Sequence, residues 1–119
     1  MATFALAMLV CADLERSKRF YRTILGLRLN TDAAPHWVDF DLGEGRMLGL
    51  HPAGEGLTVK PGSLQLGFHV EDVDKFVTDA RTAGVPILQE PHDESFGRIA
   101  VIADPDGYPV QVATPKPAR

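Results

Sequence analysis

Apolar and polar residues follow two kinds of pattern along this chain. Between residues 63 and 70 every second residue is apolar, which is typical of a strand with one buried face. Between residues 73 and 80 the apolar residues recur three and four positions apart, which predicts an amphipathic helix. Residues 4–11 are a continuous apolar run that also predicts a strand, and residues 14–25 repeat the helical spacing. A strand followed by a helix is therefore expected twice.

The two strand–helix pairs belong to a longer internal repeat. Residues 9–14 align with residues 68–73 at an offset of 59, and residues 40–45 align with residues 102–107 at an offset of 62. Self-similarity of this kind indicates two copies of one structural plan. The copies predict a single domain over 1–119, built from a first module of about 1–60, a second of about 61–114, and a tail at 115–119.

Local signals mark where the helices begin and end. Asp13 and Asp72 are expected to be N-caps, because a carboxylate there accepts unpaired amide hydrogens and meets the positive end of the helix dipole. Gly26 and Gly84 supply the left-handed residue that ends each helix. Three short strands should follow each helix, near 27–31, 36–42, 46–51, 85–89, 98–103 and 108–113. The segments 52–62 and 90–97 are expected to be the least structured.

Composition narrows the functional classes. The chain carries 12 Lys and Arg against 16 Asp and Glu, a net charge of −4, and no basic stripe, which argues against nucleic acid as a partner. No segment reaches the roughly 18 apolar residues of a membrane span. The apolar run 4–12 has no basic residue before it, so we interpret it as a buried strand rather than a signal peptide. With Cys11 as its only cysteine, the protein needs no oxidising compartment, and a cytoplasmic location is expected.

Several segments together resemble a known superfamily. They are the opening Cys11-Ala12-Asp13-Leu14-Glu15-Arg16-Ser17 with Phe20-Tyr21 and Leu25-Gly26-Leu27, then Phe96-Gly97-Arg98, then Asp104-Pro105-Asp106-Gly107-Tyr108. In order and spacing they are similar to the vicinal oxygen chelate superfamily of glyoxalases, bleomycin resistance proteins and extradiol dioxygenases. The resemblance implies an α+β fold of two tandem βαβββ modules that form an open, barrel-like mixed sheet around a cleft, usually in a homodimer.

The same resemblance implies where a metal ion would be held. Catalytic members place His, Gln or Glu at one point on the first and on the fourth strand of each module. Carried onto this chain, those four positions are Leu6, Gly49, Gln65 and Gln111. Leucine and glycine offer no side-chain donor, and neutral amides bind Zn, Ni or Fe more weakly than imidazole or carboxylate does. We therefore expect no metal ion and no other cofactor.

Other polar residues could line the expected cleft. His69 shares a strand face with Gln65, and His51 follows Gly49 by two positions, so both imidazoles could point into the cleft as polar wall residues. Asp39 and Asp41 share one strand face, and the apolar residues Val38, Phe40 and Leu42 lie on the opposite face. If they face inward, they would favour a cationic ligand or act as proton acceptors with raised pKa values; otherwise they form a solvated face.

The remaining candidates each have two interpretations. Trp37 could stack on a planar ligand or pack at a dimer interface. Met8 and Met47 could line the cleft or fill the core. Arg98 could reach an anionic ligand, although a surface ion pair is simpler. Three residues are expected to have no role in a site: Cys11, packed against the helix, and His36 and His92, solvated in or beside loops.

These observations predict a metal-free, dimeric protein that binds an aromatic or amphipathic small molecule, in the manner of antibiotic- or toxin-sequestering relatives. The expected ligand-binding residues are Leu6, Met8, Trp37, Met47, Gly49, His51, Gln65, His69 and Gln111. Two alternatives remain. One is a glyoxalase-like lyase, isomerase or dioxygenase with an atypical metal, or with His51, His69 or Asp39 as general base. The other is an interaction module whose cleft is filled by its own side chains.

Overall fold

The computed structural model describes residues 1–54 and 56–116. Within it the chain divides into two compact units, Met1–Lys60 (unit 1) and Pro61–Arg119 (unit 2). Each unit contains one four-stranded mixed sheet and one main helix. Among the described residues no strand pairs with a strand of the other unit, so the sheets are not closed into one barrel. The predicted α+β fold with two βαβββ modules is confirmed.

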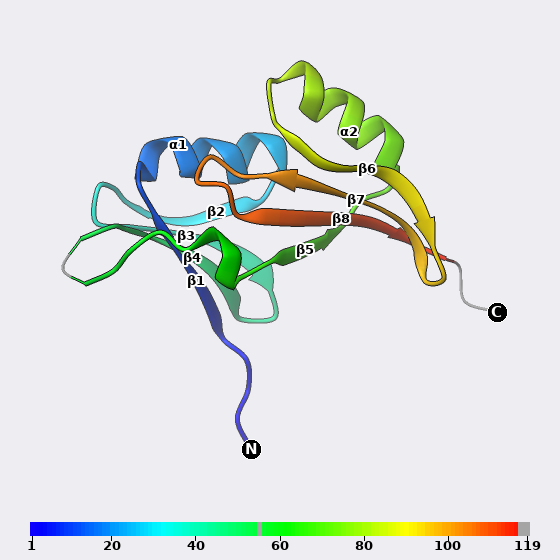
Figure 1. Cartoon of the computed structure of the whole chain (residues 1–119). Coiled ribbons are helices and arrows are strands. Elements are labelled where there is room, and N and C mark those ends of the chain that lie inside the picture. The colour runs from blue at the N-terminus through cyan, green and yellow to red at the C-terminus, as the bar shows by residue number, and fades with distance from the viewer. Residues whose placement is uncertain (55, 117–119) are drawn as a thin grey trace. The chain divides into compact units, whose positions relative to one another are not determined.

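Unit 1 contains the first helix and four strands (Figure 1). Its elements are β1 (Leu6–Cys11), α1 (Leu14–Arg19), a π-helical turn (Phe20–Ile24), β2 (Arg28–Ala33), β3 (Trp37–Gly43) and β4 (Arg46–Pro52). The strand order is β1-β4-β3-β2, and β1 runs parallel to β4 while the other pairs are antiparallel. The helix packs against β3 and β4.

Unit 2 repeats this topology. Its elements are a 3₁₀ turn (Pro61–Ser63), β5 (Leu66–His69), α2 (Val73–Thr82), β6 (Ile87–Glu94), β7 (Gly97–Ala103) and β8 (Pro109–Pro115). The strand order is β5-β8-β7-β6, again with one parallel pair, β5 with β8. Among the described residues, no helix has the length and apolar character that crossing a membrane requires.

The predicted helix boundaries are confirmed at both ends. The carboxylate of Asp13 accepts a hydrogen bond from the backbone N–H of Arg16, and Asp72 accepts one from that of Lys75, each at 3.1 Å. Gly26 and Gly84, which follow the helices, have φ angles of +69° and +84°. Side chains with a Cβ rarely adopt this left-handed conformation, which explains why glycine ends both helices.

The core of each unit lies between the helix and the sheet. In unit 1, Phe40, Leu48 and Leu50 are almost completely buried, and the ring of Tyr21 packs 6.3 Å from that of Phe40. In unit 2, Val110 and Val112 of β8 and Ile102 of β7 are completely buried. Cys11, also completely buried, lies on the helix side of β1, as expected.

One sequence prediction of a loop is wrong. Residues 90–97 were expected to be irregular, but β6 continues to Glu94, and His92, expected in or beside a loop, is a half-buried strand residue. Pro91 cannot donate a backbone hydrogen bond, and it is tolerated because β6 is an edge strand with a register shift between Gln89 and His92. His36, in contrast, is exposed in a turn, as predicted.

The strand ends also differ from the sequence prediction. β1 and β5 begin at Leu6 and Leu66 rather than at residues 4 and 63. At the other end of the chain, Pro115 of the expected tail is the last residue of β8, and the backbone N–H of Lys116 donates to the carbonyl of Phe96 at 3.0 Å. The rest of that tail, residues 117–119, lies outside the described residues.

Candidate functional site

Strand alternation places six of the predicted ligand-binding residues on one face of the unit 1 sheet, the face opposite α1. We call this the helix-free face of unit 1. Strand register aligns Met8, Gly49 and Asp39 in one row across β1, β4 and β3, and Leu6 with Met47 in the next. The six are Leu6 and Met8 of β1, Trp37 of β3, and Met47, Gly49 and His51 of β4. The structure therefore brings together all the unit 1 residues of the predicted site.

Trp37 lies over Gly49, the residue at one of the four family metal-ligand positions. A Cβ atom built on Gly49 would lie 2.6 Å from Cζ2 of the indole, closer still to Cη2, and 3.2 Å from Cδ1 of Leu6. Ordinary van der Waals contact requires about 3.4 Å or more. Glycine is therefore needed here because the indole fills the space that a side chain would occupy.

Asp39 holds the indole in place. Its Oδ2 accepts a hydrogen bond from Nε1 of Trp37 at 2.9 Å, and its Oδ1 accepts from the side-chain amide of Asn30 at 3.0 Å and the backbone N–H of Thr31 at 2.9 Å. Burial acts to raise the pKa of Asp39, but these hydrogen bonds outweigh it and the pKa lies below the ordinary carboxyl value. The expectation of a raised pKa for an inward-facing Asp39 is wrong, since its neighbours donate to the charged form.

Asn30 was not among the residues that the sequence singled out. It reaches Asp39 from β2, where the register shifts between Leu29 and Thr31. A bulge of this kind changes which residues face each other across two strands. No periodicity in the sequence signals it, so the contact could not be predicted.

His51 stands beside the indole on the same face. The two ring centroids are 6.3 Å apart in an edge-to-face arrangement, and the imidazole is half-buried. Its Nδ1 lies 2.7 Å from the carbonyl oxygen of Pro52. A carbonyl can only accept, so this contact fixes the proton on Nδ1 and makes Nε2 of the neutral ring a hydrogen-bond acceptor.

Asp41, the second carboxylate of this face, has a cationic neighbour. Its Oδ1 accepts from the backbone N–H of Gly43 at 2.7 Å, and its Oδ2 lies 3.9 Å from Nη1 of the exposed Arg28. Asp39 and Asp41 are thus on the same face, as predicted, but differ in their surroundings.

The unit 1 residues at the family ligand positions do not fit a transition-metal ion. Leu6 and Gly49 have no donor atom, and the indole fills the space beside Gly49. Within residues 1–54 and 56–116, no three His, Cys, Asp or Glu side chains are grouped as a metal ion would require. The chemistry of this face is that of an aromatic ring with acceptor groups at its edge.

Unit 2 carries the other predicted site residues. Gln111 of β8 pairs with Gly67 of β5, and the exposed His69 lies two residues further along β5. Gln65 is exposed and immediately precedes β5. At the repeat positions of Trp37 and Asp39, which lie 62 residues later, this unit has Ile99 and Val101.

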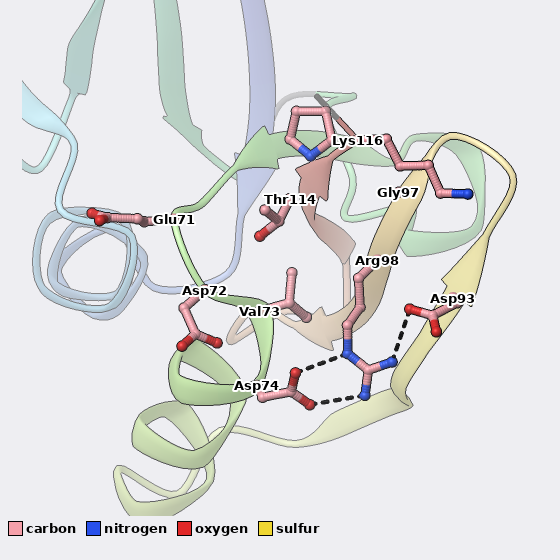
Figure 2. Close-up of a pocket in the computed structure, with 10 residues that line it drawn as sticks. Glu71, Asp72, Val73, Asp74, Asp93, Gly97, Arg98, Thr114 and Lys116 are labelled. Atoms are coloured by element: carbon pink, nitrogen blue, oxygen red, sulfur yellow. Dashed lines mark hydrogen bonds and ion pairs between the residues drawn. The ribbon is translucent and has the colours of Figure 1, made fainter. Parts of the chain in front are cut away.

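A depression of about 370 Å³ in unit 2 contains Arg98 (Figure 2). The guanidinium of Arg98 makes two hydrogen bonds to Asp74, of 2.8 and 2.9 Å, and one of 3.0 Å to Asp93. These partners raise the pKa of Arg98, and Arg98 in turn lowers the pKa of Asp74. The ion-pair interpretation of Arg98 is confirmed, since its donors are engaged by the chain's own carboxylates.

Comparisons with known proteins agree with this fold. The model of the Glyoxalase/Bleomycin resistance protein/Dioxygenase superfamily matches residues 3–112. The phenazine antibiotic resistance protein EhpR of Enterobacter agglomerans is 28% identical over 114 residues, which cover 90% of this chain and 88% of EhpR.

Two solved structures illustrate the range of similar proteins. TnmS3, an antibiotic binding protein from Streptomyces sp. CB03234, is 26% identical with a TM-score of 0.78, and the match covers 98% of each chain. Lactoylglutathione lyase from Agrobacterium tumefaciens is 22% identical with a TM-score of 0.75, and the match covers 96% of this chain and 94% of the lyase. The likeness to the lyase shows a shared fold only.

Proposed function

The chain belongs to the Glyoxalase/Bleomycin resistance protein/Dioxygenase superfamily, and we propose that within it this protein binds an aromatic or amphipathic small molecule without a metal ion. The binding surface is the helix-free face of unit 1, where Trp37 supplies a flat ring and Leu6, Met8 and Met47 supply apolar contacts. The biological role that follows is sequestration of an antibiotic or a toxic compound, achieved by binding alone.

The position of Trp37 over Gly49 is the observation that carries this proposal. An indole with its edge fixed by Asp39 is a pre-organised surface on which a planar ring can stack. A metal ion at this point would need donor side chains in place of both Leu6 and Gly49. The similarity to EhpR, a phenazine antibiotic resistance protein, and to TnmS3, an antibiotic binding protein, supports the same function.

Trp37 is the only tryptophan in the chain, so its fluorescence reports on this face alone. We expect planar aromatic compounds to quench or shift its emission in a saturable titration. A compound present at 100 times its dissociation constant should also raise the free energy of unfolding by about 2.7 kcal/mol. Trp37→Ala should weaken binding of the same compound at least tenfold when binding is followed by calorimetry, because the stacking surface is lost.

The proposal fails if a broad set of planar compounds leaves both the emission and the unfolding transition unchanged. It also fails if binding occurs but Trp37→Ala and the unmodified chain bind equally well. Trp37→Phe is the matched control, since it keeps an aromatic ring and should retain part of the affinity.

Two further parts of the proposal concern unit 2 and the oligomeric state. Gln65, His69 and Gln111 are proposed to orient polar groups of the ligand through neutral hydrogen bonds. A homodimer is also proposed, as the resemblance to the superfamily implies. Sedimentation velocity of the purified chain tests the dimer.

A further inference from the structure

The carboxylate of Asp39 is a charge without a counter-charge in the described part of the chain. The groups that donate to it are neutral: an indole, a side-chain amide, and the backbone amide and hydroxyl of Thr31. No Lys or Arg nitrogen of the described residues lies within ion-pair distance of it, whereas Asp41 on the same face has Arg28 at 3.9 Å. Its hydrogen bonds keep Asp39 ionised at neutral pH, as its lowered pKa indicates.

This negative charge stands at the edge of the ring that the proposed ligand would contact. Oδ2 of Asp39 accepts from Nε1 of Trp37, so the carboxylate lies in reach of groups at the rim of a stacked molecule. The donors to this carboxylate are neutral, so its hydrogen bonds do not cancel its negative charge. That charge therefore remains to attract a cationic group at the rim of the ligand.

Two other features of this face favour the same ligand charge. The π face of an indole attracts cations through its quadrupole. His51 presents Nε2 as an acceptor, because its Nδ1 proton is directed to the carbonyl of Pro52. An indole face, a carboxylate and an imidazole acceptor together offer no donor to an anionic ligand.

We infer that the helix-free face of unit 1 selects planar aromatic ligands that carry a positive charge, and that Asp39 is the specificity-determining residue for this charge. The inference rests on the proposed function and adds the charge class of the ligand. A cationic ring system would stack on Trp37 with its charged or N–H-bearing edge toward Asp39. Anionic compounds with the same rings would be repelled.

Three compounds with one ring system test the inference: N-methylacridinium, neutral acridine and an acridine carboxylate. Each is titrated into the full chain at neutral pH, and binding is followed by calorimetry and by the emission of Trp37. A cation near an ionised carboxylate is attracted to it, so N-methylacridinium should bind about tenfold more tightly than neutral acridine or better. The carboxylate should bind most weakly.

Asp39→Asn provides the test variant and Asp41→Asn its matched control. Both remove one negative charge from the same face, but Asp41 already has Arg28 as a neighbour. Asp39→Asn should reduce the preference for the cation over neutral acridine to about threefold or less, while Asp41→Asn should leave most of it. Added salt provides a second measurement on the unmodified chain, because it should weaken binding of the cation and leave that of neutral acridine unchanged.

The outcomes separate this inference from the proposed function. Equal affinities for the cation and neutral acridine, or tighter binding of the carboxylate, would overturn the charge selectivity and leave the proposed function standing. A cation preference that is insensitive to both salt and Asp39→Asn would remove Asp39 as its cause. If none of the three compounds binds, the proposed function fails and the inference fails with it.

Discussion

The two units of this chain have the same topology but different chemistry on their helix-free faces. In unit 1, strand register pairs Asp39 with Gly49; 62 residues later the matching pair in unit 2 is Val101 with Gln111. Trp37 of unit 1 likewise corresponds to Ile99. Unit 1 thus carries an aromatic ring whose N–H is hydrogen-bonded to a carboxylate. Unit 2 carries aliphatic side chains and an amide at the matching positions.

The helix-facing sides of the same strands are alike. Phe40 and Ile102 occupy matching positions, as do Leu48 and Val110, and all four are almost completely buried. The fold is therefore specified by the side of each sheet that packs against its helix. The opposite side can change without loss of the fold, which is how a single scaffold accommodates different functions.

Core truncation should give the largest effects and should affect both units similarly. Phe40→Ala removes a completely buried ring, and we expect a loss of about 3–5 kcal/mol in the free energy of unfolding. Ile102→Ala should cost about 2–5 kcal/mol. Urea denaturation of each variant measures both values. A near-zero cost in one unit would show that the two cores do not play equivalent roles.

Adding a methyl group on the helix-free face should distinguish the units. Gly49→Ala places a Cβ against the indole of Trp37, so the ring must move, and we expect a cost of about 1–3 kcal/mol in stability with a changed Trp37 emission. Gln111→Ala, at the matching position, adds no atoms and should leave the emission unchanged. Identical spectra for Gly49→Ala and the unmodified chain would contradict the described position of the ring.

The amides of unit 2 should have a smaller effect, on affinity rather than stability. Gln65→Ala and Gln111→Ala should each weaken binding of a ligand by roughly 1 kcal/mol if the side chain makes a neutral hydrogen bond to it. Calorimetric titration of both variants measures this. Unchanged affinity in both would remove unit 2 from the proposed polar contacts.

The smallest expected effect is a pH dependence that comes from Asp39 of unit 1, a position at which unit 2 has Val101. The pKa of Asp39 is lower in the folded chain than its ordinary value of 3.8, so its contribution to stability is present above that value and is lost as the pH falls through the folded pKa. Asp39→Asn has no such contribution to lose. The difference in unfolding free energy between the two proteins should therefore shrink below about pH 4. A difference that stays constant with pH would contradict the hydrogen bonding of Asp39.

Most of the fold could be predicted because the determining signals are local. The alternation in β5, the N-caps Asp13 and Asp72, and the left-handed glycines Gly26 and Gly84 all depend on neighbouring residues. The extent of β6 was missed, because Pro91 normally disfavours a strand and only its edge position allows it.

The candidate site could be predicted only in part. Strand alternation was sufficient to place Trp37, Gly49 and His51 on one face. The contact between Asn30 and Asp39 depends on a bulge in β2, and the contact of the indole with Gly49 depends on a side-chain rotamer. Neither leaves a pattern in the sequence.

The central claim is that Trp37 and its neighbours bind a small molecule without a metal ion. Its most direct test is a calorimetric titration of a planar aromatic compound, such as N-methylacridinium, into protein dialysed against a strong chelator. We predict an affinity equal to that of the undialysed protein, and lost on Trp37→Ala. Binding that disappears on dialysis and returns with Ni, Zn, Fe or Mn would contradict the claim.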